Sequence, residues 1–125
     1  MEKKYECLLC LGSNTEGMIH LKNAEKTLNR FFPLIRWGKI LKTPAEGDTV
    51  CETTYLNRIA KFQTSLDMET VQHILKQVEV ENGRTAESKR TGIIPLDIDL
   101  LEFNGQVLKP EDMKKNYVRR AMLLI

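Results

Sequence analysis

Apolar positions recur at two different periods along the chain, and these periods separate predicted strands from predicted helices. Short apolar or alternating runs predict strands at residues 5–11, 34–42, 55–64 and 96–103. Asn104-Gly105 is a strong turn signal, so a short returning strand is expected at 106–108. A last strand is expected over 121–125.

Helical spacing of apolar residues predicts two helices. The first covers 19–32, where Pro33 ends the pattern. The second starts after Asp67, whose side-chain oxygen can cap the first turn, and Asn82-Gly83 ends it. The predicted core stripes are Leu21, Ala24, Leu28, Phe31 and Phe32 in the first helix, and Val71, Ile74, Leu75 and Val78 in the second. Residues 43–53 and 84–95 are predicted loops.

The order strand, helix, strand, strand, helix, strand predicts the fold class. Right-handed crossovers place both helices on one face of an antiparallel sheet. We therefore expect an α+β, ferredoxin-like βαββαβ sandwich in a single domain over 1–125, with the second sheet face left open for loops and ligands. A fold of this kind implies no function by itself.

Composition narrows the class of protein. The chain has 125 residues, 42% apolar and 29% charged, a balance typical of a globular domain. No apolar run reaches the roughly 18–20 residues of a membrane helix, and the N-terminal run is too short for a signal peptide, so we expect a cytoplasmic protein without a membrane partner. A net charge of +2 does not indicate nucleic-acid binding. Basic residues gather in the last third, which fits either a solvated surface or an anion site.

The cysteines do not indicate a shared metal. Cys7 and Cys10 form a C-x-x-C motif, but in a strand residues three apart point to opposite faces. Cys51 alone supplies no second pair that would complete four ligands. Metal or redox use is therefore the less favoured alternative for these thiols.

The most informative local pattern is Leu96-Asp97-Ile98-Asp99-Leu100. A period of two places both aspartates on one strand face, with Cα atoms roughly 6.5–7 Å apart. Adjacent carboxylates repel each other, so they are either exposed or shared by a cation. Mg²⁺ in proteins typically uses one or two carboxylates together with substrate phosphates. The pattern is thus compatible with an exposed acidic face or with a metal site.

Cationic residues precede this acid pair. Arg84, Lys89 and Arg90 lie in the predicted loop before the last main strand. Nucleotide phosphates need metal ions to bridge their oxygens and cationic side chains to neutralise the rest. The acids and bases together fit a nucleotide site, and an internal salt-bridge cluster is the alternative.

A third group of residues could bind a heterocycle. Tyr55 and Asn57 share a strand face, and Thr43-Pro44 opens the loop before them. An amide offers a donor and an acceptor to a heterocycle edge, and a tyrosine ring offers a stacking surface. Ordinary turn and strand residues are the alternative interpretation.

Five motifs in order give the chain a resemblance to a known family. They are Leu11-Gly12-Ser13-Asn14, Lys42-Thr43-Pro44, Tyr55-Leu56-Asn57, Val78-Glu79 with Gly83-Arg84, and Leu96-Asp97-Ile98-Asp99-Leu100-Leu101. In these residues the chain resembles the 6-hydroxymethyl-7,8-dihydropterin pyrophosphokinase (HPPK) family. The resemblance implies a ferredoxin-like fold and ATP-dependent pyrophosphoryl transfer to the pterin hydroxymethyl oxygen, with release of AMP.

The resemblance also implies roles for individual residues. Asp97 and Asp99 would hold two Mg²⁺ ions, and with Arg84 they form the implied catalytic set. The implied pterin-binding residues are Thr43, Pro44, Ala45, Tyr55 and Asn57. The implied nucleotide-binding residues are Glu79, Arg84, Arg90, Leu100 and Arg120. The partners would be the pterin and ATP, and we expect a monomer or weak dimer.

The chain departs from the family pattern at two places. The family usually reads Gly-Pro-Arg before the acid pair, where this chain has Gly92-Ile93-Ile94-Pro95. Near the C-terminus, Lys114-Lys115 and Arg120-Ala121-Met122 stand where the family commonly has a Pro-His pair and Arg-x-Phe. Three hypotheses therefore stay open: an active pyrophosphokinase, a catalytically impaired protein that binds pterin or nucleotide, and, more distantly, a ferredoxin-like nucleic-acid-binding module.

Overall fold

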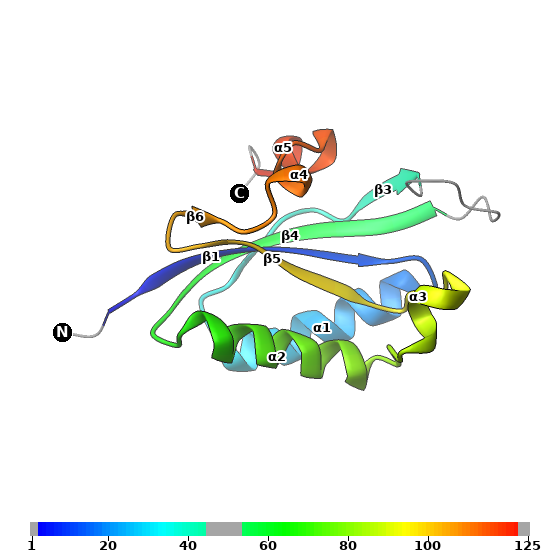
Figure 1. Ribbon diagram of the computed structural model, residues 1–125, viewed down its shortest axis with the longest axis horizontal. Helices are drawn as coiled ribbons and strands as arrows, with labels where there is room; N and C mark the ends of the chain where they lie inside the picture. Colours follow the sequence, from blue (N-terminus) through cyan, green and yellow to red (C-terminus); the bar gives the residue numbers. More distant parts are fainter. Residues whose placement is uncertain (1–2, 45–53, 123–125) are drawn as a thin grey trace.

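A computed structural model describes residues 3–44 and 54–122 as one antiparallel sheet with helices on both sides (Figure 1). The strands are β1 Tyr5–Ser13, β2 Arg36–Trp37, β3 Leu41–Pro44, β4 Thr54–Thr64, β5 Asp97–Phe103 and β6 Gln106–Val107. The helices are α1 Gly17–Phe31, α2 Met68–Glu81, α3 Glu87–Thr91, α4 Pro110–Met113 and α5 Asn116–Met122. In the described ranges no helix combines the length and the apolar character needed to cross a bilayer.

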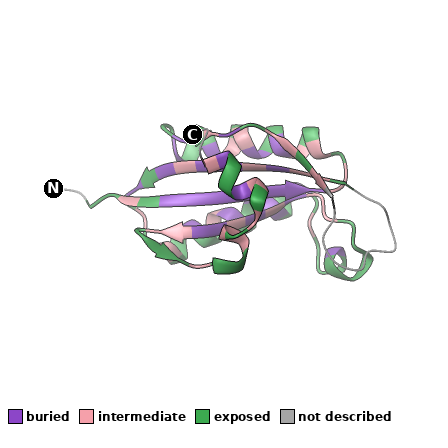
Figure 2. Ribbon diagram, turned by 90° about the horizontal axis from the view of Figure 1, so that it is seen from above, coloured by how far each residue is buried: buried purple, intermediate pink, exposed green. Residues whose placement is uncertain are grey.

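The sheet is built around β1. Its strand order is β2-β4-β1-β5-β6, with β3 paired to another part of β4, and all pairs are antiparallel. Figure 2 shows β1 as the most continuously buried strand, between β4 and β5. These features confirm the predicted α+β class and the antiparallel sheet.

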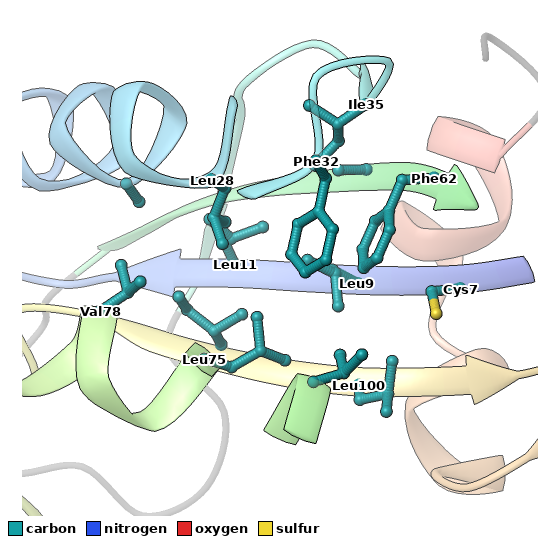
Figure 3. Packing of buried hydrophobic residues seen from close by; sticks show 14 of the residues in the cluster. Cys7, Leu9, Leu11, Leu28, Phe32, Ile35, Phe62, Leu75, Val78 and Leu100 are labelled. Atoms are coloured by element: carbon teal, nitrogen blue, oxygen red, sulfur yellow. The ribbon is translucent and has the colours of Figure 1, made fainter. Parts of the chain in front are cut away.

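The first face of the sheet, which α1 and α2 cover, carries the larger apolar core (Figure 3). The predicted helical stripes supply it: Leu21, Ala24 and Leu28 from α1 and Val71, Leu75 and Val78 from α2 are all buried. Phe32 stacks on Phe62 of β4, with ring centroids 4.0 Å apart. Asp67 caps α2 by accepting a hydrogen bond from the Thr70 N–H at 2.8 Å, as predicted. Phe31, by contrast, is largely exposed.

The second face is not open along its whole length, which corrects the expectation that helices lie on one face only. Helices α4 and α5 lie over it (Figure 1), and Val118 and Ala121 pack on Leu8, Ile59 and Leu101. The predicted last strand is wrong for residues 121 and 122, which end α5, while 123–125 lie outside the described residues. A short helix with one apolar pair among basic residues gives too weak a periodicity to identify.

Three connections also differ in detail from the prediction. The expected strand 34–42 is two strands, β2 and β3, which both pair with β4. Between them, the Gly38 N–H donates to the Ile59 carbonyl at 2.8 Å and the Gly38 carbonyl accepts a hydrogen bond from Arg58 Nε at 2.7 Å. The expected loop 84–95 contains α3. Residues 43 and 44, expected to open a loop, belong to β3, and the rest of that expected loop up to residue 53 lies outside the described residues. The predicted turn is confirmed, with positive φ at Asn104 and Gly105. Cys7 and Cys10 lie in the cores of opposite faces, as predicted.

Candidate functional site

A cavity of about 200 Å³ lies on the second face, where β1, β3, β4 and β5 pass under α4 and α5. Strand register creates it, because Gly12 of β1 lies opposite Asn57 of β4 on one side and Asp97 of β5 on the other. The lining residues are Cys10, Gly12, Thr43, Tyr55, Asn57, Asp97, Asp99, Asp112, Lys115 and Tyr117. The cavity thus joins an acidic wall from β5 to an amide and aromatic wall from β4.

The acidic wall follows from the alternation of β5. Ile98 and Leu100 are buried in the core of the first face, so Asp97 and Asp99 project into the cavity. Burial, followed by the charge of Asp97 and a hydrogen bond shared with it, raises the pKa of Asp99 to about 7, against a smaller opposing effect of Lys109. A half-buried pair of neighbouring carboxylates of this kind would be stabilised by a divalent cation, because the cation offsets the like-charge repulsion.

The donor set also fits a hard cation. Both side chains offer carboxylate oxygens, the ligands that Mg²⁺ prefers. Among the described residues no three His, Cys, Asp or Glu side chains gather closely enough to form a metal site by themselves. Two carboxylates completed by substrate phosphates and water are the usual arrangement for Mg²⁺, so the pair Asp97 and Asp99 fits that ion.

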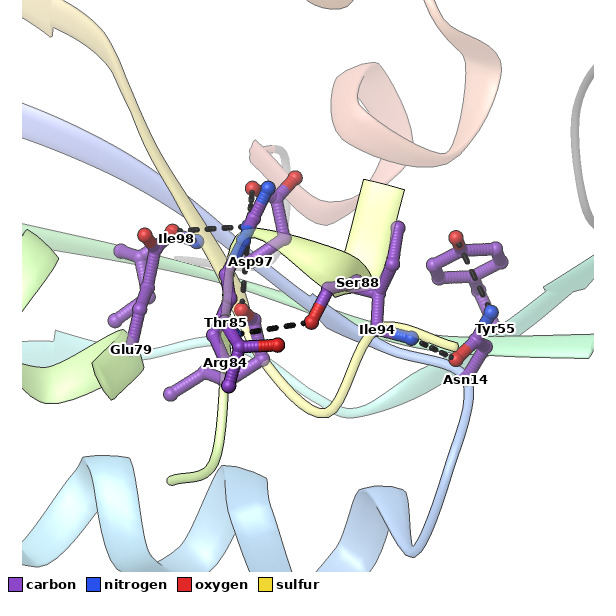
Figure 4. A network of polar contacts seen from close by, with 10 residues as sticks. Asn14, Tyr55, Glu79, Arg84, Thr85, Ser88, Ile94, Asp97 and Ile98 are labelled. Atoms are coloured by element: carbon purple, nitrogen blue, oxygen red, sulfur yellow. Dashed lines mark hydrogen bonds and ion pairs between the residues drawn. The ribbon is translucent and has the colours of Figure 1, made fainter. Parts of the chain in front are cut away.

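A polar network fixes the acidic wall from behind (Figure 4). Arg84 Nη1 donates to Asp97 Oδ1 at 2.6 Å and also lies 3.3 Å from Glu79 Oε2. Glu79 Oε2 in turn accepts from the Ile98 N–H at 2.7 Å. Burial raises the pKa of Glu79, and this hydrogen bond together with the Arg84 charge opposes that shift. Glu79 of α2 and Arg84, which follows that helix, therefore hold Asp97 and its strand in place.

The opposite wall places an amide and a phenol beside the acids. Asn57 is 6% exposed, and its Nδ2 donates to Thr43 Oγ1 across the β3–β4 pair. A Cβ built on Gly12 would lie 2.8 Å from Asn57 Oδ1, so the space in front of this amide exists because residue 12 has no side chain. Burial and the charge of Asp97 raise the pKa of Tyr55, so its hydroxyl stays protonated near neutral pH.

Asn14 joins the two walls at the end of β1. Its Nδ2 donates to the Gly92 carbonyl at 2.6 Å, and its Oδ1 accepts from the Ile94 N–H at 2.7 Å. The same Nδ2 lies 3.4 Å from the Tyr55 hydroxyl. One amide therefore holds the segment that enters β5 and contacts the aromatic wall (Figure 4).

Comparison with protein-family sequence models identifies the chain. Residues 8–125 match the family of 7,8-dihydro-6-hydroxymethylpterin-pyrophosphokinase (HPPK). The chain belongs to the HPPK family. Members of the HPPK family transfer a pyrophosphoryl group in folate biosynthesis and generally use ATP and Mg²⁺ with a pterin substrate.

The structure brings together some of the residues that the HPPK resemblance implied. Thr43, Tyr55, Asn57, Asp97 and Asp99 line the cavity. Glu79 and Arg84 do not line it but contact Asp97 or its strand from behind. Pro44 ends β3, and Ala45 lies outside the described residues.

Three proposed nucleotide residues of the HPPK pattern lie elsewhere. Arg90 is exposed on α3 and pairs with Glu87. Arg120 is exposed on α5. The side chain of Leu100 belongs to the first-face core, so only its backbone is available to a ligand on the second face. Their roles in nucleotide binding stay predictions.

Sequence reasoning missed half of the lining residues in this HPPK-family site. The predicted first strand stops at residue 11, whereas β1 continues through Gly12 to Ser13. Asp112, Lys115 and Tyr117 reach the cavity only because α4 and α5 fold over the second face. The basic pair Lys114-Lys115 was the available signal, but nothing in the sequence placed it above the acid pair.

Proposed function

We propose that the chain transfers a pyrophosphoryl group from ATP to the hydroxymethyl oxygen of 6-hydroxymethyl-7,8-dihydropterin and releases AMP. One observation carries this proposal: the acid pair Asp97 and Asp99 shares a cavity with Asn57 and Tyr55. A site for metal-bound phosphates and a site for a heterocycle edge are thereby adjacent. Membership of the HPPK family supplies the reaction class.

Asp97 and Asp99 would hold the Mg²⁺, for which we propose two ions. Mg²⁺ held by these carboxylates would supply positive charge that offsets the triphosphate and would act as a Lewis acid in the transfer. Arg84 keeps Asp97 oriented through the 2.6 Å ion pair, and Glu79 fixes the strand through the Ile98 N–H. These contacts preorganise the carboxylates, so little reorganisation is needed when the nucleotide binds.

The opposite wall would orient the pterin. Asn57 gives one amide N–H to Thr43, which leaves Oδ1, on the Gly12 side, to accept from a pterin N–H. Tyr55 offers its ring for stacking and a protonated hydroxyl for hydrogen bonding. Holding the pterin hydroxymethyl group close to the β-phosphorus converts a bimolecular step into an effectively unimolecular one.

We also propose a fold, a domain organisation, a cellular location and an oligomeric state for the protein. Taking β2 and β3 together as one edge gives the order expected of a ferredoxin-like sheet, and we propose that fold in one domain over 1–125. The substrates of the family are small molecules. We propose that the protein is cytoplasmic and acts as a monomer or weak dimer. Helix α5 covers part of the sheet face that a nucleic-acid-binding relative would offer to bases, which counts against that alternative.

A second candidate function is binding without efficient turnover. The supporting observation is the charge of the cavity: Asp97, Asp99 and Asp112 line it, and Lys115 is the one cation among its described lining residues. Arg84 is held by Asp97 and Glu79. A transferring phosphoryl group with few cationic donors reacts slowly, because each such donor contributes a large factor in rate.

Measurement of AMP separates the two functions. We expect AMP from ATP, Mg²⁺ and the hydroxymethyl-dihydropterin, and a loss of at least about 100-fold in Asp97→Asn and Asp99→Asn. Glu102→Gln is the matched control, because Glu102 is an acid of β5 that does not line the cavity. Pterin binding by calorimetry without AMP selects the second candidate. Neither AMP nor pterin binding in the folded protein overturns both.

A further inference from the structure

Lys115 is the one positively charged side chain among the described residues that line the cavity. It follows α4 and precedes α5, so its position depends on the two short helices that cover the second face. The proposed nucleotide would enter between these helices and the strands. Arg84 does not line the cavity, so Lys115 is the cation that the described lining itself supplies.

The ion pair between Lys115 and Asp112 is held more firmly than its neighbour in sequence. Lys115 Nζ lies 3.0 Å from Asp112 Oδ1, and the two side chains are 28% and 26% exposed. Lys114 and Glu111 are 3.7 Å apart, with side chains 75% and 87% exposed. Exposed pairs contribute little, whereas half-buried charges keep a defined geometry. Asp112 therefore fixes the Lys115 ammonium at the cavity wall.

Two of the other cations near the site, Arg84 and Arg90, have acidic partners of their own, and Lys109 acts on Asp99 without lining the cavity. Arg84 Nη1 lies against Asp97, Glu79 and the Leu96 carbonyl. Arg90 pairs with Glu87 on the exposed side of α3. A triphosphate in the cavity would meet three carboxylates from this chain, Asp97, Asp99 and Asp112. Metal ions at the acid pair would leave the charge of Asp112 to be offset by Lys115.

We propose that Lys115 binds the pyrophosphoryl end of the nucleotide, and that Asp112 is the positioning residue that aims its ammonium into the cavity. This inference rests on the proposed function of the site. An ammonium has three N–H donors, so Lys115 can keep its contact with Asp112 and donate to a phosphate oxygen at the same time. The assignment supplies a cation for the transferring group inside the cavity, which Arg84 does not line.

If Lys115 has this role, removal of its charge should weaken the binding of the triphosphate but should not weaken the binding of a divalent cation alone. Removal of its charge takes a donor from the bound triphosphate, and charge-assisted hydrogen bonds of this kind correspond to about 10- to 100-fold in affinity. The same change takes a positive charge away from Asp97 and Asp99, so a divalent cation alone should bind equally well or more tightly. Loss of local folding would weaken both.

The experiment compares α,β-methylene-ATP with AMP by calorimetry in Mg²⁺. In Lys115→Met we expect the affinity for the triphosphate analogue to fall about 10-fold or more, with AMP changed by less than about twofold. Lys115→Arg should recover part of the loss, because it restores the charge with a different geometry. Lys114→Met is the matched control and should leave both affinities unchanged, because Lys114 does not line the cavity.

Binding of Mn²⁺ without nucleotide, followed by electron paramagnetic resonance, supplies the second readout. Lys115→Met should bind Mn²⁺ at least as tightly as the parent chain, and Asp97→Asn should bind it much more weakly. If Asp97→Asn retains full Mn²⁺ affinity, the proposed function fails. If Asp97→Asn loses it while Lys115→Met keeps full affinity for the triphosphate analogue, the assignment of Lys115 alone is overturned. Weaker Mn²⁺ binding in Lys115→Met also overturns it.

Discussion

The two faces of β5 use the same strand for opposite purposes. Toward the first face, Ile98 and Leu100 are buried among the side chains of α1 and α2. Toward the second face, Asp97 and Asp99 stand side by side at a cavity that also contains Asp112. Burial of the apolar side chains stabilises the fold, whereas the adjacent carboxylates oppose it by repulsion and desolvation.

The difference shows that the second face carries the unfavourable interactions of the candidate site, namely the repulsion and desolvation of two neighbouring carboxylates. The pKa of Asp99 rises to about 7 because the carboxylate is half-buried beside another acid. The Arg84 guanidinium offsets the charge of Asp97 through the 2.6 Å ion pair, whereas the opposing effect of Lys109 on the pKa of Asp99 is smaller than that of burial. A cation bound at the second face would therefore relieve this repulsion, and burial on the first face offsets its cost in the absence of a ligand.

The largest expected effect is on the first face. Leu100→Ala should lower the free energy of unfolding by about 2–5 kcal/mol, because it opens a cavity in the core between β5 and the helices. Urea denaturation followed by circular dichroism measures the change. At a temperature where the variant is folded, its affinity for the nucleotide should stay within about twofold of the parent.

Leu100→Met is the matched control, since it conserves volume and should cost less than about 1.5 kcal/mol. It also keeps the test decisive if the alanine variant does not fold. A clear loss of nucleotide affinity in Leu100→Met at unchanged stability would contradict the assignment of this side chain to the core and would support its predicted nucleotide role.

On the other face of the same strand, a substitution should raise the free energy of unfolding instead of lowering it. Asp99→Asn should stabilise the metal-free protein at about pH 8 by about 1–2 kcal/mol, since water still screens part of this half-buried charge. Because the folded-state pKa of Asp99 is raised to about 7, the parent binds this proton more tightly when folded. Its contribution to stability is present at low pH and is lost as the pH rises through about 7.

The difference between Asp99→Asn and the parent should therefore shrink as the pH falls from about 7 to about 4. Urea denaturation at a series of pH values, in the presence of a chelator, measures it. Glu102→Gln serves as the control on the same strand. A stabilisation by Asp99→Asn that is independent of pH would show that something other than this carboxylate charge is responsible.

A third effect concerns the amide wall. Gly12→Ala places a methyl group 2.8 Å from Asn57 Oδ1, so Asn57 must shift from Thr43 or from the cavity. We expect pterin affinity to fall about tenfold, as for the loss of one well-placed hydrogen bond, and nucleotide affinity to change less. Calorimetry with each ligand separately measures both. Equal losses for the two ligands would indicate a general distortion of β1.

The smallest effect is a difference in thiol labelling between the two faces. Burial raises the pKa of Cys7 and of Cys10 to about 12, so both should react slowly at neutral pH. We expect Cys10 to be labelled faster than Cys7, because the short helices α4 and α5 open locally more easily than α1 and α2. Mass spectrometry of a Cys51→Ser variant measures each rate. Faster labelling of Cys7 would reverse the order of stability assigned to the faces.

Much of the fold follows from local sequence signals. The alternation in β5, the cap at Asp67 and the turn at Asn104-Gly105 are encoded by neighbouring residues, and the structure confirms them. Between β2 and β3, Gly38 is held by hydrogen bonds with Ile59 and Arg58 of another strand. Helix α5 depends on an apolar surface formed by three strands. Neither interaction leaves a periodic pattern in the local sequence.

The candidate site likewise contains some residues that local sequence signals predict and others that only the tertiary structure places. Asp97, Asp99, Tyr55 and Asn57 could be proposed from spacing, because a period of two fixes which side chains share a strand face. Lys115 and Asp112 could not, since their place above the acid pair exists only after α4 and α5 fold onto the second face. Their assignment needs the tertiary structure.

The side chain of Asn14 has a consequence for chemical ageing of the protein. It donates to the Gly92 carbonyl and accepts from the Ile94 N–H, a combination that an amide provides and a carboxylate does not. Deamidation would convert the donor into an anionic oxygen that faces a carbonyl oxygen. A single slow hydrolysis at this residue would thus release the segment that leads into Asp97 without altering any residue of the cavity lining.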